Sequence, residues 1–137
     1  AQTLESAIMK TDGYIADHAI VARQLNKPLV IEEFGLPRDQ HKFSLDAPTT
    51  NRDRYYANIF EKVLSSAKKN GIIAGANFWA YGGLARPQNT RPFWKPGDDY
   101  MGDPGQEEQG LNSVFDTDTT MGIVKDFNQK IRSATSK

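Results

Sequence analysis

The chain lacks cysteine, net charge and long apolar segments, and each absence removes a class of function. Without cysteine it has no disulfide framework and no thiolate metal site, although this fits any cellular compartment. Its 17 Lys and Arg residues balance 17 Asp and Glu residues, which gives no electrostatic basis for binding nucleic acid. Its apolar stretches are too short to span a bilayer, and no basic-then-apolar signal segment opens the chain. We therefore expect no nucleic-acid partner and no membrane span.

Apolar residues recur at helical spacing in three segments of this 137-residue chain, which is long enough for one small domain. Thr3 is a plausible N-cap of the first helix, and the pair Thr50 and Asp53 resembles a capping box for the second. Gly71 is the expected left-handed cap at the end of the second helix. The predicted helices cover residues 3–25, about 49–70, and about 118–132, followed by a polar tail over 133–137.

Two short apolar runs, residues 28–34 and 72–80, alternate with these helices. Both are apolar on the two faces that a strand presents, a pattern typical of strands in parallel sheets. Strands separated by helices predict an α/β fold with a parallel sheet and right-handed crossovers. Two strands are too few to cover these helices, because an isolated two-stranded sheet is marginally stable.

Chemically active side chains follow both predicted strands. Glu32 and Glu33 end the first strand before Phe34 and Gly35, and Trp79 lies at the end of the second. An unpaired buried carboxylate is costly, whereas the C-terminal end of a barrel strand is where catalytic residues lie. The alternative is that the acidic pair is a solvated strand end or the cap of a following helix.

Two long loops complete the chain. In the first, residues 36–48, Arg38 can contact a ligand or be solvated, and His41 is expected to be a surface residue. The second runs from residue 81 to about 119, is rich in aromatic residues, and is therefore expected to be ordered and functional. Its acidic residues do not have the spacing of an EF-hand calcium loop, so we expect no metal and no cofactor.

Three segments resemble a known enzyme family. Residues 27–35, Lys-Pro-Leu-Val-Ile-Glu-Glu-Phe-Gly, resemble strand seven of the glycoside hydrolase family 5 barrels, which ends in Glu-Phe-Gly or Glu-Tyr-Gly. Residues 75–80, Gly-Ala-Asn-Phe-Trp-Ala, are similar to strand eight, which carries a sugar-stacking tryptophan. The loop over residues 97–118 is similar to that of the endo-β-1,4-mannanase branch. The resemblance covers nearly the whole chain.

The resemblance implies the C-terminal portion of a (β/α)8 TIM barrel. The expected order is helix six, strand seven, helix seven, strand eight, a long loop and helix eight, all within residues 1–137. A complete barrel takes roughly 250 residues, so strands one to six have no sequence here. The expected partners are therefore the missing N-terminal part of the barrel and β-mannan or a related neutral polysaccharide.

The resemblance also implies roles for individual residues. Glu33 corresponds to the nucleophile of a retaining mechanism, and Trp79 to the aromatic platform beneath the sugar at the cleavage point. Tyr81, Trp94 and Arg38 are the further expected substrate-binding residues. Glu32 is expected to face the other side of the strand, because successive side chains alternate. The family's acid/base residue lies in an Asn-Glu dipeptide, which this sequence lacks, so it must lie outside this chain.

The leading interpretation is a retaining endo-glycoside hydrolase that cleaves β-1,4-mannosidic bonds, with the isolated fragment inactive. The family implies a secreted, periplasmic or cell-surface location. Three alternatives stay open: a β-1,4-glucan endo-hydrolase of the same family, a non-catalytic carbohydrate-binding barrel, and a self-contained small α/β domain in which Glu33 is structural.

Overall fold

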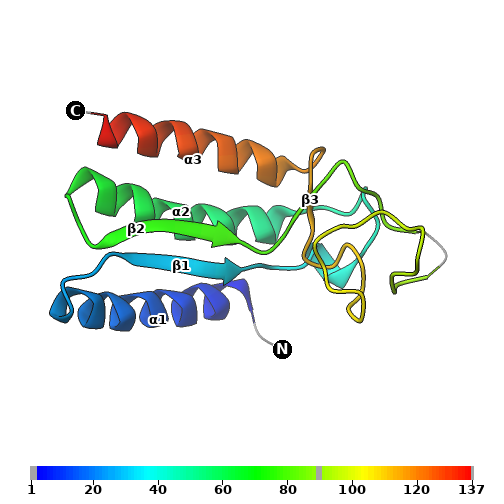
Figure 1. The fold of residues 1–137 in the computed structure, drawn as a ribbon, viewed down its shortest axis with the longest axis horizontal. Helices are drawn as coiled ribbons and strands as arrows, with labels where there is room; N and C mark the ends of the chain where they lie inside the picture. Colours follow the sequence, from blue (N-terminus) through cyan, green and yellow to red (C-terminus); the bar gives the residue numbers. More distant parts are fainter. Residues whose placement is uncertain (1–2, 89–90, 137) are drawn as a thin grey trace.

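Two parallel strands with helices against one side form the body of the computed structural model, which describes residues 3–88 and 91–136 (Figure 1). The helices of this described part have nearly the predicted bounds. They are α1 (Leu4–Gln24), α2 (Thr50–Lys68) and α3 (Thr119–Thr135), with a short 3-10 turn, η1 (Asp39–His41), between β1 and α2. The last helix extends to Thr135, beyond its predicted end. None of these helices is long and apolar enough to cross a membrane.

The helix ends agree only in part with the capping predictions. Thr3 caps α1 as predicted, because its side-chain oxygen accepts a hydrogen bond from the Ser6 amide at 3.2 Å. Helix α2 begins after Thr49, whose side chain does not cap the helix. The predicted cap at Gly71 is wrong, since the left-handed residue is Asn70, with a φ of 50°.

Two parallel pairs of strands occur in the described residues. The predicted strands are observed as β1 (Leu29–Phe34) and β2 (Ile73–Phe78), which pair in parallel. The short strands β3 (Tyr81–Gly83) and β4 (Val114–Phe115) also pair in parallel and lie inside the segment predicted to be irregular. The order of helix, strand, helix, strand, long loop and helix is as predicted. Because β1 and β2 point the same way, the loops that follow them gather at one end (Figure 1).

An aromatic cluster forms the core between the strands and the helices. Phe34 at the end of β1 packs edge-on against Tyr56 and Phe60 of α2, with ring centroids 4.9 and 5.6 Å away. Phe127 of α3 packs on Phe60 at 5.9 Å. The apolar stripe predicted for α2 is therefore core, and it holds the C-terminal end of β1 against two helices.

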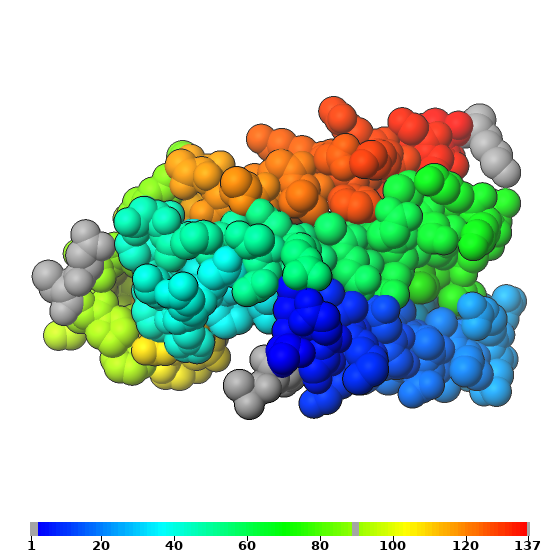
Figure 2. Space-filling view, turned by 180° about the vertical axis from the view of Figure 1, so that it is seen from behind, coloured from blue at the N-terminus to red at the C-terminus, as the bar shows by residue number. Residues whose placement is uncertain are grey.

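The opposite face of the strands is open. Seen from behind, α1, α2 and α3 lie side by side and cover one face of the molecule (Figure 2). On the other face Val30, Glu32, Glu33 and Asn77 are all exposed. The prediction that both strands are buried on both faces is therefore not met within this chain.

Candidate active site

A β-bulge brings two carboxylates to the open face at the end of β1. Ile31 is paired with Ala76 and Phe34 with Phe78, so two residues of β1, Glu32 and Glu33, lie opposite a single residue of β2. Such a bulge inserts one residue and re-aims the side chains that follow it. Ile31 and Phe34 both pack into the core, which strict alternation over four positions does not allow. The two glutamates between them are exposed.

The expectation that Glu32 and Glu33 face opposite sides of the strand is wrong for this reason. The Asn77 amide donates a 2.8 Å hydrogen bond to Glu32 Oε2, across the open face from β2. Glu33 itself has a φ of 52°, a left-handed conformation that is uncommon outside glycine. Local strain of this kind is concentrated at functional sites. The chain thus bends so that Glu33 projects into solvent at the strand end.

Backbone contacts tie Trp79 to the segment that carries Glu33. The Trp79 amide donates a 2.7 Å hydrogen bond to the Phe34 carbonyl. A Cβ at Gly35 would lie 2.6 Å from the Trp79 carbonyl oxygen, closer than real Cβ contacts. The glycine that ends the Glu-Phe-Gly motif is therefore required by the close approach of the next strand end. The structure brings Glu33 and Trp79 to neighbouring positions on one edge.

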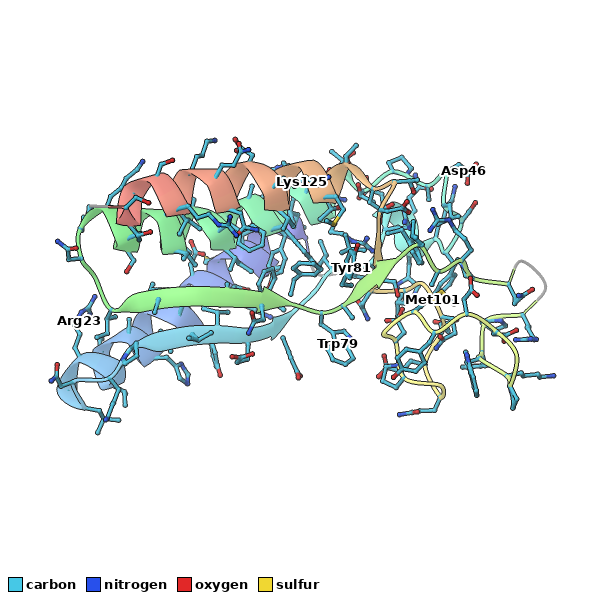
Figure 3. The ribbon with its side chains drawn as sticks, turned by 45° about the horizontal axis from the view of Figure 1, so that its top comes forward. Arg23, Asp46, Trp79, Tyr81, Met101 and Lys125 are labelled. Atoms are coloured by element: carbon cyan, nitrogen blue, oxygen red, sulfur yellow. The ribbon has the colours of Figure 1, made fainter. Side chains whose placement is uncertain are left out.

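The three predicted aromatic residues, Trp79, Tyr81 and Trp94, all follow β2 in the chain. Figure 3 shows Trp79 just past the arrowhead of β2, on the side away from α3, and Tyr81 on β3. Trp79 is partly exposed, and Tyr81 is 60% exposed. Trp94 lies on the long loop, where its indole N–H donates to the Asp98 carbonyl at 3.3 Å. Trp79 and Tyr81 are therefore both accessible near the strand ends, whereas Trp94 is held by its own loop.

Arg38 is buried, so it is neither the solvated residue nor the ligand-contacting residue that the sequence suggested. Only 2% of it is exposed, and its guanidinium donates to Asp118 Oδ1 at 2.6 Å and to the Ala47 carbonyl at 3.2 Å. The guanidinium also lies 5.6 Å from the centre of the Phe115 ring. With its charge paired in the interior, Arg38 joins the loop after β1 to the start of α3 and has a structural role here.

Arg52 is a buried residue that the sequence reading missed. It is fully buried on α2 and donates to three backbone carbonyls: Leu36 at 2.7 Å, Ser113 at 3.0 Å and Leu111 at 3.2 Å. It also lies 3.4 Å from Asp118. These bonds clamp the segment just after Glu33 to the end of the long loop.

The acidic residues of the long loop are engaged within the loop. Asp98 accepts two bonds from the Arg91 guanidinium, one of them at 2.6 Å, and the Arg91 contact holds the pKa of Asp98 below its ordinary value. Asp103 is buried and accepts from the Gly110 amide at 2.9 Å and from the Ser113 hydroxyl. Within residues 3–88 and 91–136, no three His, Asp or Glu side chains gather as a metal site.

His41 lies near the long loop. It is exposed, as expected, and its Nε2 lies 3.8 Å from a carboxylate oxygen of Glu108. The two loops that follow β1 and β2 therefore approach each other at the same end of the molecule as Glu33 and Trp79.

Glu33, Trp79 and the two long loops gather at one end of the molecule. A carboxylate and an aromatic ring stand at the C-terminal ends of adjacent parallel strands, flanked by long loops. This is where the active sites of (β/α)8 barrel enzymes lie.

The comparisons with known proteins identify the family. The family model described as "GH family 5 beta-mannosidase-like" matches residues 1–136. The chain therefore belongs to glycoside hydrolase family 5, as the resemblance predicted, and the curated relatives below agree with the predicted mannanase branch.

Among curated relatives, a putative mannan endo-1,4-beta-mannosidase of Arabidopsis thaliana is 35% identical over 68 residues, which is 50% of this chain and 15% of the relative. Mannan endo-1,4-beta-mannosidase 1 of Oryza sativa subsp. japonica is 29% identical over 122 residues, which is 88% of this chain and 22% of the relative. The chain thus spans less than a quarter of the length of these two relatives.

Solved structures of the family 5 mannosidase from Rhizomucor miehei have the same fold. One is 36% identical with a TM-score of 0.85, over 96% of this chain and 33% of that chain. A variant in complex with mannosyl-fructose is 35% identical with a TM-score of 0.86, over 98% of this chain and 33% of that one. The chain therefore spans about a third of each of these structures. Because they are TIM-barrel proteins, the strands and helices of this chain match one part of such a barrel.

Proposed function

We propose that this chain is the C-terminal part of the catalytic barrel of a retaining endo-β-1,4-mannanase, with Glu33 as its nucleophile. The observation that carries this proposal is the bulge that turns Glu33 to the open face beside Trp79. The mannan-directed names of the relatives support the substrate class. The family's polysaccharide substrate favours action outside the cell.

In the proposed mechanism, Glu33 attacks the anomeric carbon as a carboxylate. A protonated carboxyl group on another part of the barrel gives its proton to the leaving glycosidic oxygen as the bond to carbon breaks. The resulting mannosyl ester of Glu33 is hydrolysed by a water molecule, which the second carboxylate deprotonates. The two carboxyl groups of retaining enzymes lie about 5–5.5 Å apart, so the second one has to reach the open face of β1.

The open face and strand edges favour a further part of the barrel as the partner of this chain. Val30 of β1 is 41% exposed, Tyr14 of α1 is 64% exposed, and Leu25, which follows α1, is 65% exposed. Leaving such residues uncovered forfeits apolar burial, and an exposed strand edge invites pairing. Neighbouring strands of the barrel would cover Val30 and bring the acid/base carboxyl group to Glu33, and neighbouring helices would cover Tyr14 and Leu25.

Trp79 is the proposed sugar platform. Mannan is uncharged, so its recognition depends on hydroxyl groups and on the apolar faces of the pyranose rings. A partly exposed indole beside the nucleophile can cover such a ring face, and Tyr81 offers a second exposed ring. The balanced charge of the chain is compatible with a neutral ligand.

Substituting Glu33→Gln in the intact protein tests the assignment. We expect hydrolysis of mannan to fall to background while binding of mannooligosaccharides, measured by calorimetry, is retained, because the amide is isosteric but a poor nucleophile. The matched control is Glu32→Gln, which alters the adjacent exposed carboxylate and should leave substantial hydrolysis. Full activity of Glu33→Gln would remove Glu33 from the mechanism.

An exo-acting β-mannosidase is the second candidate. The solved structures that match nearly all of this chain are named mannosidases, and one holds the disaccharide unit mannosyl-fructose. The products of a long mannooligosaccharide labelled at its reducing end separate the two modes. Internal cuts give labelled products of several lengths from the start, whereas exo action removes one mannose at a time from the opposite, non-reducing end, so the labelled product shortens one unit at a time. A panel with β-1,4-glucans tests the remaining alternative within the family.

A further inference from the structure

The peptide groups around Trp79 are fixed by a buried tyrosine of α2. Tyr56 is fully buried, and its hydroxyl donates to the Trp79 carbonyl at 3.3 Å. Its ring packs against Phe34, with centroids 4.9 Å apart, and against Phe78 at 5.6 Å. Tyr56 therefore touches the last residue of β1, the last residue of β2, and the carbonyl of the platform residue.

We propose that Tyr56 is a positioning residue that sets the place of the Trp79 platform relative to Glu33. This inference rests on the proposed function, in which Trp79 stacks on the sugar held at Glu33. The Trp79 amide is bound to the Phe34 carbonyl at 2.7 Å, so the platform residue is held at its N–H by β1 and at its carbonyl by α2. Gly35 leaves no room for the carbonyl to shift toward β1, since even a Cβ there would lie 2.6 Å from it.

The Tyr56 hydroxyl is well suited to a permanent donor role. Burial raises the pKa of Tyr56 above its ordinary value near 10, so the phenol keeps its proton throughout the range in which enzymes work. A buried carbonyl without a hydrogen-bond donor costs free energy. Loss of the Tyr56 hydroxyl therefore favours a shift of the Trp79 peptide group toward another donor or water. Small displacements of a positioning group are enough to lower binding and rate.

The chain contains a matched control one residue away. Tyr55 is also on α2, is 9% exposed, packs against Phe34 at 6.4 Å, and shares a 2.8 Å hydroxyl hydrogen bond with Thr11. Tyr55→Phe and Tyr56→Phe therefore remove the same atom from neighbouring positions of one helix. Only the second substitution removes a bond to Trp79.

The experiment compares both variants in the intact protein. We expect Tyr56→Phe to raise KM for a mannooligosaccharide about three- to tenfold, the range that loss of one hydrogen bond gives, with a smaller change in kcat. When Tyr56→Phe is combined with Glu33→Gln, the dissociation constant of the mannooligosaccharide should rise by the same factor relative to Glu33→Gln alone. Tyr55→Phe should change both constants less than about twofold, even where it lowers the unfolding midpoint as much as Tyr56→Phe.

Trp79→Ala separates failure of this inference from failure of the proposed function. If Trp79→Ala weakens binding strongly but Tyr56→Phe does not, the positioning role is refuted and the platform stands. If the two tyrosine variants weaken binding equally, the effect is a general softening of α2 and the inference is again overturned. If Trp79→Ala leaves binding unchanged, the platform itself is wrong and the positioning role falls with it.

Discussion

Replacing Arg52 by lysine should destabilise the protein strongly, although the charge is kept. The guanidinium donates to the carbonyls of Leu36, Leu111 and Ser113 at 2.7–3.2 Å and also contacts Asp118. The single ammonium group of lysine cannot reproduce three nitrogens that point to different segments. At about 1–3 kcal/mol for each buried carbonyl left without a donor, loss of two such bonds costs roughly 2–6 kcal/mol. That is a large part of a typical stability of about 5–15 kcal/mol.

The matched control is Arg54→Lys on the same helix. Arg54 pairs with Glu5 at 3.3 Å, and the two side chains are 58% and 70% exposed. Exposed pairs contribute about 0–1 kcal/mol, and lysine keeps the charge, so we expect a change within about 0.5 kcal/mol. Denaturant unfolding of the intact protein measures both variants through the midpoint and the slope. Equal losses for the two substitutions would refute the reasoning that Arg52 acts as a buried clamp.

Two further predictions concern the strand end and the long loop. Gly35→Ala should lower the free energy of unfolding by about 1–3 kcal/mol, because the added Cβ would lie 2.6 Å from the Trp79 carbonyl oxygen. Gly13→Ala, at an open position of α1, should instead raise it by up to about 1 kcal/mol. Thermal unfolding measures both variants, and a change of the same sign in the two would contradict this prediction. The pKa of Asp98 is lowered by the Arg91 hydrogen bond from an ordinary value of 3.8, so the contribution of this pair is complete above that value and is lost as the pH falls through the lowered one. The protection factors of the amide protons between Arg91 and Asp98, corrected for intrinsic exchange, should therefore fall as the pH drops below the ordinary Asp value of 3.8, and Asp98→Asn should remove this pH dependence of protection. An unchanged protection profile in the variant would rule out this pair as the cause.

The regular elements were predictable because their periodicity is strong. The helical spacing of apolar residues on α2 and the two apolar runs of β1 and β2 located these elements to within a few residues. The strand ends then identified Glu33 and Trp79 as a pair, since parallel strands bring their C-terminal ends to one edge.

The exposure of both Glu32 and Glu33 on one face could not be predicted from alternation. Alternation holds only while the ladder is regular, and the bulge adds one residue to β1. The conformation of Glu33, with φ at 52°, has no glycine or asparagine to signal it. The two glutamates therefore share the exposed face because the aromatic core takes both Ile31 and Phe34.

The buried arginines were obscured by the usual preference of charged residues for the surface. Arg38 and Arg52 are buried because Asp118 and several loop carbonyls, distant in sequence, converge on them. One signal was available for Arg52, which lies four residues before Tyr56 and seven before Ile59 on the apolar stripe of α2. No comparable local pattern marks Arg38, whose partners come from the fold alone.

The most direct test of the central proposal is to locate the covalent sugar on the intact enzyme. A 2-deoxy-2-fluoro-mannoside with a good leaving group should form a slowly hydrolysed ester with the nucleophile of a retaining enzyme. Peptide mass spectrometry should then find one fluoromannosyl group on the peptide that contains Glu33, and none in the Glu33→Gln variant. A label on a different carboxylate, or release of product with inverted anomeric configuration, would contradict the assignment of Glu33 as the nucleophile.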